Sequence, residues 1–320
     1  MIIFLGVLSF PGRLPAQTDS ADVVTLSFNW PVGLTARVTH VREQIRDNGE
    51  SVDTTGAAIT YSMHVRQQGA GRLVSFDDFE LVGGAPEDGG EVMQQLTEQI
   101  GTFMPALVID SAGDVTEISG VEQMVSQVRA LLQPMLDSLP PEAGGLNRLL
   151  ERMLSQSYFE AKALEDWNAL IGLWRDAEFE LGAVYQLEAD EPIPILPGRT
   201  IPFVYEFSFL ERAPCSEERT DSSCVVLEMI SVPDADSLAS LLEAVFGEAA
   251  PELGEGRIIY RKLDLENYIR LLTEPSGLIP HRLEIIQVFG GDIEVPGEGQ
   301  ATVYQERTRR FHYVYEPEGR

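Results

Sequence analysis

The two cysteines are the residues whose spacing says most about chemistry. Cys215 and Cys224 flank a short polar segment, and strand-like runs precede and follow it at 201–210 and 225–230. Two cysteines at the facing ends of a hairpin loop can meet the Cα separation that a disulfide requires. The alternative, a metal or redox pair, needs more ligands or a Cys-x-x-Cys spacing, and neither is present. The sequence therefore predicts a structural disulfide.

The other side chains that catalyse reactions show no known spacing. None of the four histidines is paired at metal-ligand spacing, and each is expected to be a surface or sheet residue: His40, His64, His281 and His312. The chain has no Gly-x-Ser-x-Gly, Ser-x-x-Lys, P-loop or Gly-x-Gly-x-x-Gly motif, so serine acyl transfer and nucleotide binding have no signature. We expect no cofactor and no metal site, and an enzyme is not the favoured class.

Carboxylates leave one catalytic alternative open. A glycoside-hydrolase type of chemistry needs two carboxyl groups facing a shared cleft. Asp77, Asp78 and Glu80 are one candidate group, and Asp110 with Asp114 is another. The chain holds 51 acidic residues, so adjacency of two of them carries little information. The first group also fits solvated strand positions, and the second fits a turn.

The composition describes a folded, strongly acidic protein. Of 320 residues, 44% are hydrophobic and 23% are charged, with 23 basic residues and a formal net charge of −28. A field of that sign repels phosphate backbones and anionic membrane surfaces, which argues against both as partners. Arginine greatly outnumbers lysine, and the bias fits either a GC-rich genome or adaptation to salt.

The first residues resemble a targeting segment. An apolar run at 2–10 is too short to span a bilayer, and Pro11 and Gly12 interrupt it before Ala16. We therefore expect residues 1–16 to be a cleavable signal sequence and the protein to be exported, to a periplasmic or extracellular location. A buried N-terminal strand is the alternative. No later stretch is expected to form a transmembrane helix, and the predicted disulfide agrees with an oxidising compartment.

Hydrophobic periodicity divides the chain into strands, helices and strands again. Alternating runs fill 23–82, and helical stripes are expected at 91–104, 120–139, 146–154 and from 157. Strands return from 183 to 315, interrupted by one helix at 237–246. This order predicts an α+β fold, a curved antiparallel meander sheet packed against a central helical layer. The two parts, 17–182 and 183–320, are expected to form one continuous unit.

Three short phrases resemble uncharacterised exported proteins of bacterial cell envelopes. They are Trp30-Pro-Val-Gly33, Leu196-Pro-Gly198 and Thr273-Glu-Pro-Ser-Gly-Leu-Ile-Pro-His281, the last with Ser276 where Thr is usual. Those families imply no activity and no site residues. The broad pattern is also similar to the lipoprotein-carrier class, and that similarity implies a curved sheet around an apolar cavity.

The leading functional hypothesis is a non-enzymatic envelope protein that binds a lipid or another apolar small molecule between sheet and helices. The alternatives are a structural or partner-binding protein with a filled core and the carboxylate hydrolase. Ligand identity and oligomeric state stay open. The candidate lining residues are apolar and lie mostly on the expected helices: Trp30, Met93, Leu96, Ile100, Val128, Leu132, Leu150 and Trp167.

Overall fold

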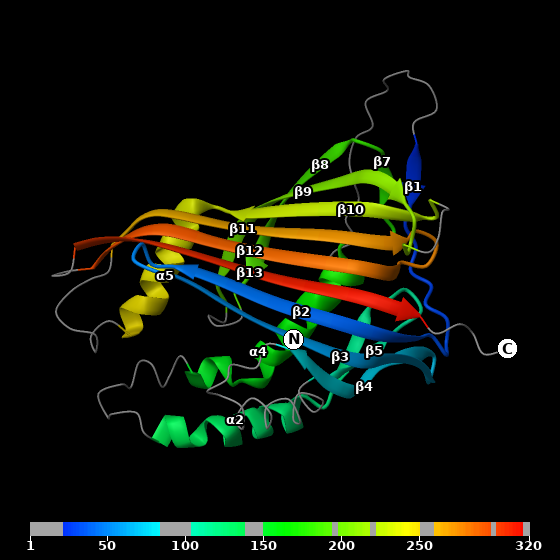
Figure 1. Ribbon diagram of the computed structural model, residues 1–320, viewed down its shortest axis with the longest axis horizontal. Helices are drawn as coiled ribbons and strands as arrows, with labels where there is room; N and C mark the ends of the chain where they lie inside the picture. The colour runs from blue at the N-terminus through cyan, green and yellow to red at the C-terminus, as the bar shows by residue number, and fades with distance from the viewer. Residues whose placement is uncertain are drawn as a thin grey trace.

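One large antiparallel sheet dominates the computed structural model, which describes residues 22–83, 104–137, 150–193, 198–217, 222–249, 259–295 and 299–315. Its eleven strands follow the order β6-β5-β4-β3-β2-β13-β12-β11-β10-β9-β8, and β1 and β7 form a separate pair. Figure 1 shows the strands side by side in one twisted layer, with β1 beside β7 at one end.

The strands of the N-terminal part are β1 (Val23–Thr25), β2 (Thr35–Asp47), β3 (Val52–Gln68), β4 (Gly71–Gly83), β5 (Ala106–Ile109) and β6 (Val115–Ser119). Those that follow are β7 (Glu178–Glu180), β8 (Val184–Pro192), β9 (Thr200–Ala213), β10 (Cys224–Pro233), β11 (Ile259–Glu274), β12 (Ile279–Val295) and β13 (Gly299–Tyr315). The helical elements are α2 (Val121–Asp137), α4 (Gln156–Trp167), the π-helix η2 (Asn168–Gly172) and α5 (Ala235–Ala249).

The predicted α+β class with a central helical layer was wrong. The protein is mainly β, and the few described helices do not form a layer against the sheet. The strands run well beyond their apolar centres, because polar residues continue the two-residue alternation at their ends. For example, β11 continues as one strand through Asp264–Asn267, where three of the four side chains are polar. The expected helix at 91–104, apart from its last residue, and the expected signal sequence at 1–16 lie outside the described residues.

Two helices begin slightly earlier than their sequence signals suggested. Ser155 caps α4, because its side chain accepts a hydrogen bond from the Tyr158 amide at 3.3 Å. Asp234 takes the corresponding place before α5 and accepts from the Ser237 amide at 2.8 Å. In both cases a side-chain oxygen satisfies an amide that has no partner within the helix. None of the helices in the described part of the chain is long and apolar enough to cross a membrane.

The sheet joins the two ends of the described chain through one strand pair. β13 pairs antiparallel with β2 along twelve residue pairs, from Tyr304–Asp47 to Tyr315–Ala36. We call the face that carries Val38 of β2 and Phe311 of β13 the inner face, since both side chains are buried in the core. The opposite face is the outer face. The segment from Val24 to Trp30 and the connection from Trp167 to Phe179 also contribute buried side chains to that core.

Aromatic packing fixes the centre of the core. Trp30 and Trp167 meet edge to face with ring centroids 5.4 Å apart, and Phe28 lies beside both. Trp167 Nε1 donates to the Gly113 carbonyl at 3.0 Å. Gly113 has a φ of +88°, and a Cβ there would lie 2.8 Å from the Phe28 ring, so this turn requires glycine.

The predicted disulfide is confirmed. Cys215 and Cys224 are bonded with their Cα atoms 5.1 Å apart, and the bond closes the connection between β9 and β10. Both residues are buried. The bond thus links two neighbouring strands at one end of the large sheet.

Candidate functional site

The structure brings together two of the candidate lining residues, Trp30 and Trp167, in the packed core. Trp30 is fully buried and donates its Nε1 proton to the Leu278 carbonyl at 2.9 Å. Val128 in α2 and Leu150 are half-buried. Met93, Leu96 and Ile100 lie outside the described residues, as does the side chain of Leu132. A ligand role for these residues stays a prediction.

A polar region continues the inner face beyond this core. Because side chains alternate between faces along a strand, the residues that follow Val38 and His40 on the inner face are Arg42, Gln44 and Arg46. The same alternation on β13 places Arg309, Arg307 and Gln305 beyond Phe311. The strand register then sets the inner-face pairs as His40 with Phe311, Arg42 with Arg309, Gln44 with Arg307, and Arg46 with Gln305.

Four guanidinium groups therefore gather on two adjacent strands; we call Arg42, Arg46, Arg307 and Arg309 the arginine cluster. Arg309 is half-buried, and the other three are exposed. With the amides oriented to suit their neighbours, the side-chain oxygens of Gln44 and Gln305 accept from Arg46 and Arg307, each at 2.9 Å. These bonds hold two of the guanidinium groups in place on the sheet.

Helix α4 supplies the carboxylates nearest to the cluster. Arg309 pairs with Glu165 at 2.9 Å and with Asp166. Arg42, Arg46 and Arg307 form no ion pair with any residue that the structure describes. Glu165 also pairs with Lys162, so these two carboxylates are shared by five cations, and the patch is locally basic in a chain whose net charge is −28.

His40 forms the boundary between the apolar core and the arginine cluster. Its ring stacks on Phe311 with centroids 4.0 Å apart, and its Nε2 accepts from Arg42 Nε at 3.3 Å. Burial, followed by the positive charges of Arg42 and Arg309, lowers the pKa of His40 from 6.5 to about 3. The imidazole is therefore neutral at physiological pH and acts as an acceptor.

The buried neutral state of His40 makes stability pH-dependent. Below pH 6.5 the unfolded chain gains a proton that the folded chain does not bind until about pH 3. The free energy of unfolding should therefore fall as the pH drops through this window, by up to about 1.4 kcal/mol per pH unit from this group. In urea unfolding series we expect His40→Gln to reduce this slope relative to the unmodified protein. Equal slopes in His40→Gln and the unmodified protein would contradict this assignment.

An apolar strip adjoins the arginine cluster on the inner face. Five half-buried side chains on β9, β11, β12 and β13 form it: Phe203, Leu263, Leu265, Phe289 and Val303. The register pairs Leu265 with Phe289 and Phe289 with Gln305, and Gln305 accepts from Arg307, so the strip lies next to the cluster. α5 contacts β9 and β11 near this end of the sheet. Half-buried apolar side chains beside exposed cations form an amphipathic surface.

The candidate carboxylates are occupied by local structure. Asp77 contacts His64 at 2.8 Å, and Glu80 pairs with Arg37 at 2.6 Å. Asp110 accepts from the amides of its own turn, and Asp114 pairs with Arg175 at 2.5 Å. These interactions are those of strand surfaces and turns, so this geometry does not favour the hydrolase alternative.

A shallow open pocket of about 310 Å³ lies between the β8–β9 hairpin and the start of α5. Arg199, Asp236, Ser237 and Ser240 are among the residues that line it, and the lining is mainly polar. It differs in character from the apolar site that the sequence suggested.

Comparison with known proteins leaves the chain without a family. No family model matches the sequence, and no curated protein matches it. Among solved structures, an outer membrane channel from Pseudomonas putida F1 matches with 8% identity and a TM-score of 0.18, covering 93% of this chain and all of that one. A TM-score this low does not establish a shared fold.

Proposed function

We propose that this protein binds an anionic amphiphile, an acyl or alkyl chain that carries a phosphate or carboxylate, on the inner face of its sheet. The observation that carries the proposal is the adjacency of the arginine cluster and the apolar strip on the inner face. The headgroup would lie at Arg42 and Arg307, and the chain would cover Phe289 and Leu265. The disulfide supports placing this function in an oxidising compartment, as expected for an exported protein.

The guanidinium groups of the arginine cluster favour a compact anionic headgroup. Guanidinium groups bind phosphate and carboxylate through paired hydrogen bonds, which strengthens and orients the contact. A net charge of −28 repels anions at long range, so a basic patch on such a chain needs a local explanation. A bound headgroup supplies the negative charge that the described carboxylates provide only to Arg309.

The dimensions of the strip suit a long chain. From Gln305 on β13 to Phe203 on β9 the surface crosses four strand spacings, which is about 19 Å at the usual separation of neighbouring strands. Burying apolar surface of this kind stabilises a complex by roughly 25 cal/mol per Å² before the losses of association are counted. The apolar strip therefore supplies affinity, and the arginine cluster selects the headgroup.

A second candidate is a structural or partner-binding protein with a filled interior. The close packing of Trp30, Trp167 and Phe28 favours it, because this part of the core is occupied by the chain's own side chains. The two candidates make different predictions for the apolar strip, whose side chains are only half-buried. A ligand binds there in the first candidate, and none binds there in the second.

Calorimetric titration with soluble dodecyl phosphate separates them. We expect saturable binding of dodecyl phosphate, much weaker binding of dodecyltrimethylammonium, and weaker binding of inorganic phosphate alone. The cationic amphiphile has the same chain and the opposite charge, so it is the matched control. Absence of saturable binding would overturn the proposal in favour of the filled-core alternative. Equal affinity for both amphiphiles would show that the arginine cluster does not select the headgroup.

A further inference from the structure

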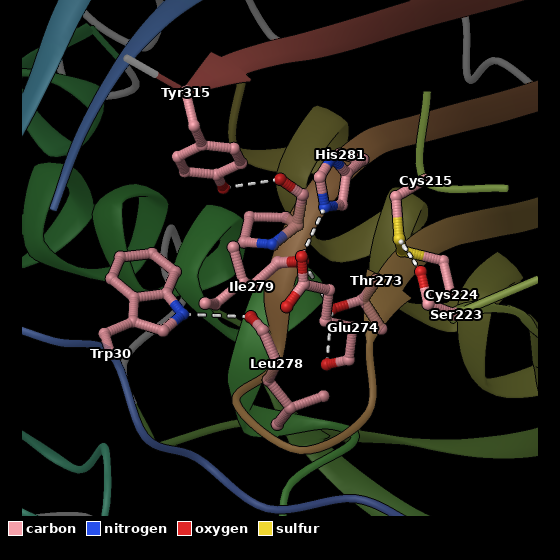
Figure 2. A network of polar contacts seen from close by, with 11 residues as sticks. Trp30, Cys215, Ser223, Cys224, Thr273, Glu274, Leu278, Ile279, His281 and Tyr315 are labelled. Carbon is pink, nitrogen blue, oxygen red and sulfur yellow. Dashed lines mark hydrogen bonds and ion pairs between the residues drawn. A yellow bond between two sulfur atoms is a disulfide. The ribbon is translucent and has the colours of Figure 1, made fainter. Parts of the chain in front are cut away.

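The disulfide has a histidine beside it that lies far away in the sequence. The sulfur atoms of Cys215 and Cys224 and a ring nitrogen of His281 all lie within 4.8 Å of one another. Figure 2 shows the three side chains converging from the β9–β10 connection and the start of β12. All three groups are shielded from solvent, and the His281 side chain is 12% exposed.

The surrounding contacts hold the imidazole in place. His281 Nε2 lies 3.2 Å from Glu274 Oε1, and the ring meets Tyr315 edge to face at 5.4 Å. The backbone on which His281 sits is also fixed, because Thr273 Oγ1 donates to the Ile279 carbonyl at 3.0 Å and Tyr315 Oη donates to the Pro280 carbonyl at 2.5 Å (Figure 2). The histidine therefore stays near the sulfurs without depending on the disulfide itself.

Two thiolates and one imidazole are a ligand set that Zn²⁺ prefers. Zinc binds sulfur at about 2.3 Å and histidine nitrogen at about 2.0–2.1 Å, so ligand atoms of one tetrahedral site lie about 3.3–3.8 Å apart. Reduction frees the two bonded sulfur atoms to move apart into that range, and the ring nitrogen of His281, which lies within 4.8 Å of both, reaches it by a shift of its side chain. Histidine ligands of zinc also commonly interact with a carboxylate that orients the ring, and Glu274 already occupies such a position.

The geometry points to a Zn²⁺ site that is masked by the disulfide and formed when the disulfide is reduced. A dithiol donates two electrons and two protons to the Cys215–Cys224 bond and becomes a disulfide itself. Zn²⁺ then displaces the two thiol protons and binds both thiolates and His281, with water in the fourth position. The metal thus replaces one crosslink between β9 and β10 with another and ties both strands to β12.

Cobalt titration of the full chain tests this site, because tetrahedral Co²⁺ with thiolate ligands has strong visible and charge-transfer absorption. The protein is reduced with dithiothreitol, freed of reductant without air, and titrated with CoCl₂ and then with competing ZnCl₂. We expect one equivalent of tetrahedral Co²⁺ in the reduced protein, displaced by Zn²⁺, and none in the oxidised protein. A reduced, folded protein without this absorption would overturn the proposal.

Variants identify the ligands. His281→Ala should lower the Co²⁺ affinity of the reduced protein at least tenfold, and the exposed His312→Ala should leave it unchanged. Equal affinity in His281→Ala and the unmodified protein would also overturn the site. If reduction unfolds the chain, Zn²⁺ should restore its near-ultraviolet circular dichroism because binding is coupled to folding. Failure of Zn²⁺ to do so, or equal recovery in Cys215→Ser/Cys224→Ser, would count against the proposal.

Discussion

Replacing Arg42 and Arg307 together by glutamine is expected to lower the affinity for dodecyl phosphate by about tenfold to a hundredfold. A hydrogen bond to a charged group is worth about 1.5–3 kcal/mol, and each 1.4 kcal/mol is a factor of ten in affinity. Arg307 is exposed and Arg42 is partly accessible, although burial lowers the pKa of the Arg42 guanidinium, so water and salt reduce this contribution. Isothermal calorimetry at low and at high ionic strength measures the loss, which should shrink as salt rises.

The outer face offers a control with the same change of charge. Arg270 and Arg282 are exposed on strands of the same sheet, and their partners are Glu211 and Glu217. Arg270→Gln/Arg282→Gln lowers the net charge as much as the first pair does. It should leave the affinity within about twofold of the original, since its effect is only a screened long-range field. Equal losses in both double variants would show that net charge, and not the arginine cluster, controls binding.

Replacing Trp30 by alanine is expected to destabilise the fold by about 3–5 kcal/mol, the range for truncating a buried large aromatic side chain. Trp30 is fully buried, it contacts Trp167 and Phe28, and its indole nitrogen satisfies the Leu278 carbonyl. The alanine variant leaves a cavity between these rings and a buried carbonyl without its partner. Equilibrium unfolding in guanidinium chloride measures the change.

Two further variants, Trp30→Phe and Tyr304→Ala, serve as references for the loss of unfolding free energy in Trp30→Ala. Phenylalanine keeps most of the apolar volume and loses only the hydrogen bond, so its effect should be clearly smaller. Tyr304 is 37% exposed on β13, and its replacement should change stability by less than about 1 kcal/mol. A Trp30→Ala loss as small as that of Tyr304→Ala would mean that the indole lines an open site instead of the core.

Part of the arginine cluster was predictable from β2 and β13 taken singly. The apolar alternation that ends in Val38 and His40 continues in polar residues as Arg42, Gln44 and Arg46. No apolar residue follows His40 on the inner face, so apolar alternation alone does not indicate that the strand continues. Extending the two-residue alternation past its apolar part would have placed these side chains on one face.

The pairing of β2 with β13 could not be predicted. The two strands are separated by most of the chain, and local periodicity carries no information about which distant strand lies alongside or in which register. For the same reason the sequence did not predict which residues surround the disulfide. The hairpin spacing predicted the bond between Cys215 and Cys224, but the approach of His281 depends on how β12 sits in the sheet.

The class prediction failed for a related reason. Apolar residues at helical spacing are easily recognised in a sequence, whereas the polar ends of long strands are not. The sequence-based prediction therefore overestimated the helical part of the fold. β3, β12 and β13 each extend over seventeen residues, and their apolar centres are shorter than that. Strand propensity depends on the neighbouring strands, so the ends of these strands are defined by pairing and not by composition.

The most direct test of the proposed function locates the bound chain. A dodecyl phosphate with a photoreactive diazirine at its far end is crosslinked to the protein, and mass spectrometry identifies the labelled residues. The proposal predicts labels on the apolar strip, at Phe203, Leu263, Leu265 or Phe289, that disappear with excess dodecyl phosphate. Competable labels confined to outer-face residues, or no competable label at all, would contradict it.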